Sequence, residues 1–216
     1  MAQNYQLQLD KELEAIKTAG TLPRLLLHSC CAPCSSYVLE YLSEYFAITV
    51  LYYNPNISPK EEFDHRAEEQ QRLIREMPLK HPAAFRLGEY KPEEFDAIAK
   101  GREDMPEGSA RCFDCYRLRL EEAAKIAKTE GFDYFTTTLS ISPLKNAQKL
   151  NEIGEALSTE YGVSYLYADF KKREGYKRSC RLAADYHLYR QNYCGCIHSK
   201  HQAQAREAAK VQEKAE

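Results

Sequence analysis

Strand-like and helix-like segments alternate along most of this chain, and their order limits the folds that it can adopt. Runs of aliphatic, β-branched and aromatic residues predict strands at 24–28, 47–57, 83–90, 132–140 and 163–170. The segments between them predict helices at 35–46, 58–77, 112–129 and 143–162. Such alternation indicates an α/β domain with a parallel sheet and helices on both faces, in which ligands bind beyond the carboxyl ends of the strands.

Local signals predict where some of these helices begin and end. Ser58 is followed three residues later by Glu61, which predicts a capping box at the start of the second helix. Gly131 predicts the end of the helix at 112–129. The stretch 100–109 is rich in charged residues, glycine and proline, and it predicts a mobile loop just before that helix.

The length of 216 residues favours a single domain over the whole chain, 1–216. Within it we expect an α/β core at 22–170, a basic, tyrosine-rich segment at 171–200 and a polar tail at 201–216. No apolar run approaches the roughly 20 residues that a membrane-spanning helix needs. The opening residues also lack the basic-then-apolar order of a secretory signal. We therefore expect a cytoplasmic protein that does not span a membrane.

Eight cysteines are present, and seven of them fall into three short groups. Disulfides are rare in the reducing cytoplasm, where clustered thiols more often bind metals or carry out redox chemistry. The grouping therefore predicts a metal and redox centre instead of a disulfide framework. The remaining cysteine, Cys180, fits the role of a small apolar packing residue. The three groups are Cys30-Cys31-x-x-Cys34, Cys112-x-x-Cys115 and Cys194-x-Cys196.

Both zinc and iron–sulfur clusters accept four thiolates, and the spacing leaves the choice between them open. The knuckles of a zinc ribbon are about 15–20 residues apart, whereas the first two cysteine groups belong to different strand–helix units. They can meet only where the sheet brings their loops together, at the ligand crevice. Cys112 and Cys115 begin a predicted helix, where the dipole and free amide groups favour thiolates and hence metal ligation.

The third group, Cys194-Gly-Cys196, has a different geometry. A disulfide across one intervening residue closes a small, strained ring that is easily reduced. A reversible two-electron relay needs such a pair, so we favour a redox role for it. Ligation of a second metal by the same two cysteines is the alternative.

A basic segment stands out although the formal net charge of the chain is only −2. Lys and Arg outnumber Asp and Glu by seven to two between Lys171 and Arg190, and tyrosines are interleaved with them. This composition suits stacking on RNA bases and contacts with phosphates. A solvated basic helix surface is the competing interpretation. The residues predicted to bind RNA are Lys171, Lys172, Arg173, Lys177, Arg178 and Arg181.

Three long motifs follow one another in the order LLLHSCCAPCSSYVLEYL, RCFDCYRLRLEEAAKIAKTEGFDYFTTTLSISPLKN and GYKRSCRLAADYHLYRQNYCGCIHS. With them the chain resembles the QueH family of epoxyqueuosine reductases from about Leu25 to Ser199. The resemblance implies a fold related to the adenine-nucleotide alpha-hydrolase, or HUP-like, group. The residues SCCAPC stand where ATP-using relatives carry a Gly-rich phosphate loop, which argues against an ATP site.

The resemblance also implies an activity, the last step of queuosine synthesis in tRNA. Epoxyqueuosine at the wobble position of the anticodon loses its epoxide oxygen in a two-electron, two-proton reduction that releases water. The implied partners are this tRNA, bound at its anticodon stem-loop, and an electron donor that the sequence does not identify. We expect the protein to act as a monomer.

Members of that family carry a 4Fe–4S cluster with a further iron close to it. By motif position, the resemblance implies that the cluster ligands are Cys30, Cys31, Cys112 and Cys115. It also implies that the redox-active disulfide joins Cys194 and Cys196. Cys34 is a candidate ligand of the second iron. Three side chains next to the cysteine motifs are candidate proton donors: His28, Asp114 and Tyr116.

Two other functions compete with the reductase. One is an iron–sulfur tRNA-thiolating enzyme of the same broad fold, which would need the phosphate loop that this chain lacks. The other is a zinc-stapled RNA-binding module, which would hold zinc and no iron.

Overall fold

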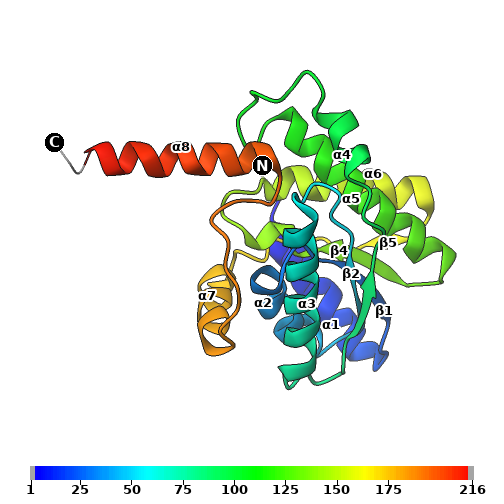
Figure 1. Ribbon diagram of the computed structural model, residues 1–216. Coiled ribbons are helices and arrows are strands. Elements are labelled where there is room, and N and C mark those ends of the chain that lie inside the picture. The colour runs from blue at the N-terminus through cyan, green and yellow to red at the C-terminus, as the bar shows by residue number, and fades with distance from the viewer. Residues whose placement is uncertain (1–2, 214–216) are drawn as a thin grey trace.

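The computed structural model describes residues 3–213 and has a five-stranded parallel sheet at its centre (Figure 1). Its strands are β1 (Arg24–His28), β2 (Ala47–Tyr52), β3 (Ala84–Leu87), β4 (Tyr134–Thr137) and β5 (Ser164–Tyr165). They lie in the order β3-β2-β1-β4-β5, and every neighbouring pair is parallel. The predicted α/β fold is therefore confirmed, and this strand order fits the implied HUP-like relation.

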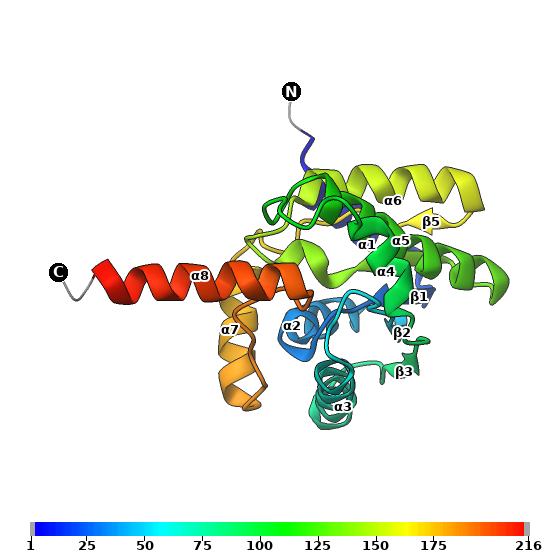
Figure 2. The ribbon, with the colours of Figure 1, turned by 45° about the horizontal axis from the view of Figure 1, so that its top comes forward.

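Helices cover both faces of the sheet. Leu25 and Leu27 pack into one hydrophobic cluster with residues of α1 (Tyr5–Ala19), α2 (Ala32–Leu42) and α3 (Lys60–Glu76). Leu26 points the other way, into a cluster with α5 (Ala110–Thr129) and α6 (Ala147–Tyr161). Figure 2 shows α2 and α3 on one side of the sheet and α5 and α6 on the other. The remaining helical elements are α4 (Pro92–Ala99), the short 3-10 helix η1 (Thr138–Ile141), α7 (Gly175–Asp185) and α8 (Ile197–Glu213).

Several boundaries differ from the sequence prediction. The capping box is wrong, because α3 begins after Pro59 and no side chain caps its first turn. The last strand is two residues long instead of eight. Just beyond it, the Thr136 hydroxyl donates to the Leu166 carbonyl at 2.8 Å. The Asn151 side chain then donates to the Ala168 carbonyl at 2.9 Å and accepts from the Ala168 amide at 3.0 Å, so side chains bond the backbone that was predicted to continue the strand.

The C-terminal part of the chain contains two helices joined by an irregular segment. α7 packs against α2, and Arg178 joins them through two contacts to the Glu40 carboxylate at 2.9 and 2.5 Å. α8 begins against the body and then projects away from it (Figures 1 and 2). The predicted polar tail at 201–216 is thus helical up to Glu213, and 214–216 lie outside the described residues. Among 3–213, no helix is both long enough and apolar enough to cross a bilayer.

The strand order fixes where ligands enter. β1 is central, the chain moves outward from it through β2 to β3, and it then crosses to β4 on the other side. The gap between the carboxyl ends of β1 and β4 is therefore the topological switch point, at which open parallel sheets bind their ligands. The first cysteine group follows β1, and η1 follows β4, so both lie at this point.

Candidate active site

The loop that carries the first cysteine group is held by buried polar contacts. Asn54, just beyond β2, donates from Nδ2 to the Ser29 carbonyl at 2.9 Å. The hydroxyls of Ser29 and Ser35 both donate to Gln70 Oε1, at 2.8 and 2.7 Å. All four side chains are buried. Because Asn54 and Gln70 belong to elements outside the loop, these contacts fix the backbone of the loop before any ligand binds.

The sulfurs of Cys30, Cys31 and Cys34 lie within 4.8 Å of one another. Cys31 is the N-cap of α2, and Cys34 lies in its first turn. The sulfurs of Cys30 and Cys31 are 3.7 Å apart. Hydrogen bonds from the thiols of Cys31 and Cys34 hold the pKa of Cys30 well below its usual range. The trio can therefore share one negative charge, and it is placed to bind a metal ion.

The other four grouped cysteines line a second cavity, which lies beside the N-terminal turns of α5. Cys112 and Cys115 are in the first two turns of that helix, where the sequence predicted a helix start. Cys194 and Cys196 face the same cavity. The amide of Gly108 donates to the Cys112 sulfur at 3.3 Å. Burial raises the pKa of Cys115 to about 12, so the helix terminus alone does not ionise this thiol.

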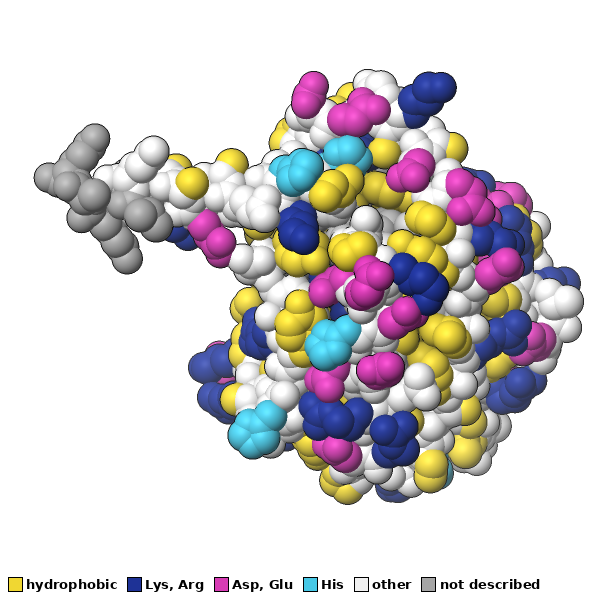
Figure 3. Space-filling view, in the orientation of Figure 1, with side chains coloured by type: hydrophobic (Ala, Val, Ile, Leu, Met, Phe, Trp, Pro, Cys, Tyr) yellow, Lys and Arg dark blue, Asp and Glu magenta, His cyan; other side chains and the backbone are white. Residues whose placement is uncertain are grey.

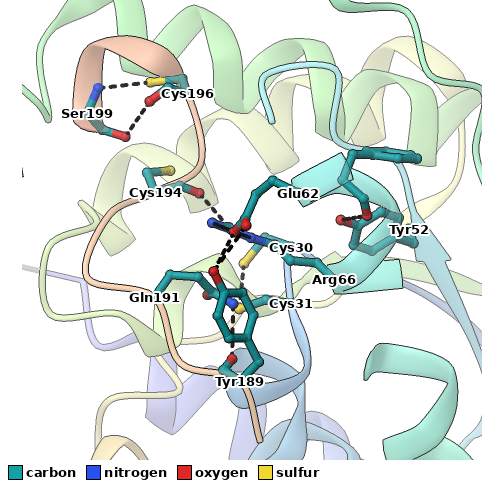
Figure 4. Close-up of polar contacts among 11 residues, drawn as sticks. Cys30, Cys31, Tyr52, Glu62, Arg66, Tyr189, Gln191, Cys194, Cys196 and Ser199 are labelled. Atoms are coloured by element: carbon teal, nitrogen blue, oxygen red, sulfur yellow. Dashed lines mark hydrogen bonds and ion pairs between the residues drawn. The ribbon is translucent and has the colours of Figure 1, made fainter. Parts of the chain in front are cut away.

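Gly195 shapes the Cys-Gly-Cys turn. Its φ of +129° is strained for any other residue, and a Cβ there would lie 2.8 Å from Ile57 Cγ1. The Ser58 amide donates to the Gly195 carbonyl at 3.1 Å. Arg66 Nη1 donates to the Cys194 carbonyl at 3.1 Å, so the turn is fastened to α3 (Figure 4). All eight cysteines lie in the described residues and are free thiols; the predicted disulfide stays a prediction.

Buried cations surround the two cysteine cavities, and sequence reasoning missed them. Arg66, Arg111 and Arg119 are each about 1% exposed, and Lys145 is 7% exposed. Arg111, Cys115 and Arg119 are spaced at i, i+4 and i+8, so they share one face of α5. That spacing was a usable signal, because arginine is seldom placed on the buried face of a helix unless it has a partner there.

A cavity of about 170 Å³ opens beside the Cys30, Cys31 and Cys34 trio at the switch point. Residues 139–145, which follow β4, form one wall. The segment 190–194 forms another wall, and Figure 4 shows Gln191 and Cys194 on this segment near Cys30 and Cys31. Tyr176 and Arg190 also line it. Cys194 and Lys145 border this cavity and the smaller one, so the two sites are adjacent.

The three candidate proton donors lie in different surroundings. His28 is completely buried, and burial lowers its pKa to about 3. One ring nitrogen is 2.8 Å from Thr137 Oγ1, and the other is 3.1 Å from the Tyr53 carbonyl oxygen. His28 has no ring nitrogen free for a substrate. Asp114 is on the surface in an ion pair with Arg102. Only Tyr116 is buried with an unpartnered hydroxyl, and it borders the smaller cavity.

The predicted RNA-binding residues are mostly engaged in ion pairs. Lys171 pairs with Asp169 and Lys177 with Glu174. Arg173 pairs with Asp10 and Arg178 with Glu40. Within residues 3–213, Lys172 and Arg181 are the members of this set that form no ion pair. Acidic and basic side chains are likewise interspersed on the face shown in Figure 3.

The donor set fits an anionic, thiolate-bound metal centre. Thiol sulfur is the ligand that both zinc and iron–sulfur clusters take, and seven thiols line the two adjacent cavities. The buried cations need negative charge nearby, because an uncompensated charge is costly to bury. Glu62 compensates Arg66 and Glu107 compensates Lys145. Thiolates on a metal would supply the charge that the other two arginines lack.

Comparison with known proteins identifies the family of this chain. Residues 25–202 match the family model described as epoxyqueuosine reductase QueH. The chain is 43% identical over 198 residues to the epoxyqueuosine reductase QueH of Staphylococcus epidermidis, covering 90% of this chain and 83% of that protein. It is 40% identical to the Streptococcus pyogenes protein of the same name over 198 residues, which cover 91% of this chain and 78% of that protein. It is 36% identical to the Thermotoga maritima protein of that name over 180 residues, which cover 81% of this chain and 89% of that protein. The resemblance found in the sequence is thereby confirmed, and this chain belongs to the epoxyqueuosine reductase family QueH.

Proposed function

We propose that this protein reduces epoxyqueuosine to queuosine at the wobble position of tRNA, the last step of queuosine biosynthesis. The reaction removes the epoxide oxygen as water and leaves a carbon–carbon double bond, which takes two electrons and two protons. The observation that carries the proposal is the cavity at the switch point, which places a thiol trio next to open space for a nucleoside. The family match supports it.

The metal centre that we propose is a 4Fe–4S cluster with a second iron beside it. Cys30, Cys31, Cys112 and Cys115 are the proposed cluster ligands, and Cys34 is the proposed ligand of the second iron. When bound, an iron–sulfur centre supplies single electrons at close range. The adjacency of the two thiol-lined cavities supports this assignment.

Cys194 and Cys196 are proposed as the redox-active pair. Conversion of two thiols into one disulfide releases two electrons and two protons, which is the amount that one deoxygenation consumes. The position of Cys194 on the border of both cavities supports this role. An external electron donor would return the pair to the dithiol. Gly195 allows the tight turn that brings both side chains to the same cavity.

The nucleoside is proposed to enter the larger cavity with its base against tyrosine rings. Tyr176 and Tyr193 line that cavity, and unstacked RNA bases are commonly held by aromatic side chains. Arg190 lies at the same wall and can donate to a phosphate. Tyr116 is the proposed proton donor, since its buried hydroxyl has no protein partner. We expect the protein to work in the cytoplasm as a monomer on the anticodon stem-loop.

The test is anaerobic incubation of the iron-reconstituted protein with a reductant and tRNA that contains epoxyqueuosine. We expect the nucleoside from digested tRNA to lose the mass of one oxygen, and the reaction to need no ATP. Gain of sulfur mass, or a requirement for ATP, would favour the thiolating enzyme. A colourless protein with bound zinc, no iron and no turnover would favour the RNA-binding module.

A further inference from the structure

Arg119 is the buried cation with the fewest protein partners. It lies on the inner face of α5 and is about 1% exposed. Its Nε donates to the Cys115 carbonyl one turn earlier, at 3.1 Å. Both terminal nitrogens, Nη1 and Nη2, are buried and have no hydrogen-bond partner. Four N–H donors of a permanently charged group are therefore unsatisfied.

Two of the other buried cations pair with carboxylates, and Arg111 makes two hydrogen bonds but has no ionic partner within residues 3–213. Arg66 Nε donates to the Glu62 carboxylate at 2.7 Å, and Lys145 pairs with Glu107 at 2.7 Å. Arg111 donates from Nη1 to the carbonyls of residues 102 and 103, at 2.7 and 2.6 Å. Among the described residues, no carboxylate forms an ion pair with Arg119.

The cavity beside Arg119 is lined by thiols together with Glu107 and two further cations, Arg111 and Lys145. Arg119 borders this smaller cavity together with all four of its cysteines. Burial lowers the pKa of Arg119, but its interactions with nearby ionisable groups, Cys115 and Cys194 first among them, leave the pKa raised overall. The charge of Cys30, which belongs to the trio at the other cavity, acts in the same direction. Arg119 is thus close enough to both cysteine groups to interact with their charges.

A buried, unpaired guanidinium destabilises a folded chain by several kcal/mol unless an anion compensates it. Arginine also keeps its charge at every accessible pH, so it cannot avoid this cost by losing a proton. The position is therefore understandable only if negative charge is present in the working protein. Tyr116, whose ring centre lies 5.9 Å from the guanidinium carbon, offers at most a weak partial compensation.

We infer that Arg119 is a charge-compensating residue of the metal centre, placed to favour its reduced form. The inference rests on the proposed thiolate-bound metal centre. Each electron that such a centre accepts adds one negative charge to a site of low dielectric constant. A fixed positive charge stabilises the reduced form more than the oxidised form, and it thereby makes the reduction potential less negative.

The test compares three variants of the full-length chain, each reconstituted anaerobically with iron and sulfide. Arg119→Gln removes the charge, and Arg119→Lys keeps it. Arg117→Gln is the matched control, because Arg117 is on the same helix but 42% exposed and paired with surface glutamates. Iron content per chain and the midpoint potential of the centre, followed by electron paramagnetic resonance, are the measurements.

We expect a more negative midpoint potential in Arg119→Gln, a value near that of the wild type in Arg119→Lys, and no change in Arg117→Gln. An unchanged potential in Arg119→Gln overturns the inference, and so does an equal shift in Arg119→Lys. If Arg119→Gln holds no iron, retention of iron by Arg119→Lys supports the inference, whereas loss from both variants overturns it. Failure of the proposed function itself is visible separately, as a wild-type protein that holds iron but leaves epoxyqueuosine unchanged. A wild type without iron removes the metal centre and the inference together.

Discussion

Lys145 Nζ lies 2.7 Å from Glu107 Oε1, and both side chains are almost completely buried. The pair joins the loop before α6 to the loop before α5, and both residues border the two cysteine cavities. Lys145→Met leaves the Glu107 carboxylate buried without its partner. We expect the free energy of unfolding to fall by about 3–5 kcal/mol, because an uncompensated buried charge costs that much. Urea unfolding at pH 7 measures the change.

A surface pair provides the control for this prediction. Lys149 and Glu152 are 3.2 Å apart, with side chains 39% and 44% exposed. Lys149→Met should therefore cost about 1 kcal/mol or less. Adding Glu107→Gln to Lys145→Met should recover a large part of the lost stability. Equal losses at Lys145 and Lys149 would contradict the importance of the buried pair.

The segment that walls the larger cavity is fastened to α3 by Glu69, which gives the fold a pH dependence. Glu69 accepts a hydrogen bond from the Tyr189 amide at 3.1 Å and pairs with Arg72. The hydrogen bond from Arg72 lowers the pKa of Glu69 below its usual 4.5. A lowered pKa stabilises the fold above pH 4.5, and this contribution disappears as the pH falls through the folded-state value. Glu69→Gln should therefore be less stable than the wild type at pH 7, and the difference should shrink in acid.

Thermal denaturation of both proteins between pH 7 and pH 3 tests this dependence. Glu76→Gln is the matched control, because it removes a more exposed partner, 45% accessible, of the same Arg72 side chain. Its effect at pH 7 should be smaller. A stability difference for Glu69→Gln that stays constant down to pH 3 would rule out ionised Glu69 as the anchor.

The fold was predictable because hydrophobic periodicity and turn residues act locally. The runs at 24–28 and 47–57 hold enough β-branched and apolar residues to specify strands without any distant contact. The outcome at 163–170 was not predictable in the same way. The strand has only two residues, and side chains of other elements, Thr136 and Asn151, bond the backbone of Leu166 and Ala168 beyond it.

The cysteines of the site were visible in the sequence, but the charges around them were not. Clustered thiols carry their chemistry in their own side chains, so their grouping alone was informative. The partners of charged side chains depend on tertiary contacts. Arg178 was expected to meet RNA, yet it pairs with Glu40, 138 residues away in sequence. Arg119 is buried beside a cavity whose thiols come from two segments far apart in the sequence.

The division of the cysteines into ligands and a redox pair gives distinct predictions for single substitutions. Cys112→Ser should lose iron and colour, because it removes a proposed cluster ligand. Cys194→Ser should keep the iron but fail to complete a turnover, since the remaining thiol of Cys196 cannot form the internal disulfide. Iron analysis and visible absorption of anaerobically purified variants, with the deoxygenation assay, measure both properties.

Two further substitutions make this experiment sharper. Cys34→Ser should lower the iron content without abolishing the cluster if Cys34 holds the second iron. Cys180→Ser is the control, because this thiol lies on α7 and belongs to neither cysteine cavity. If Cys194→Ser also bleaches the protein, Cys194 is a ligand and the proposed division is wrong.

Binding of tRNA should depend most on the two cations of the basic segment that have no acidic partner. Lys172 and Arg181 are exposed and form no ion pair with a described residue, whereas the other four predicted contacts are paired with acids. Lys172→Glu and Arg181→Glu should each weaken binding and lower the salt dependence by about one unit of log–log slope per lost phosphate contact.

Lys128→Glu is the charge-matched control, because Lys128 is in the last turn of α5, at the opposite end of the helix from Cys112. Titration of tRNA at several salt concentrations measures affinity and slope together. Equal losses in all three variants would indicate a general effect of net charge and would remove the segment from the interface.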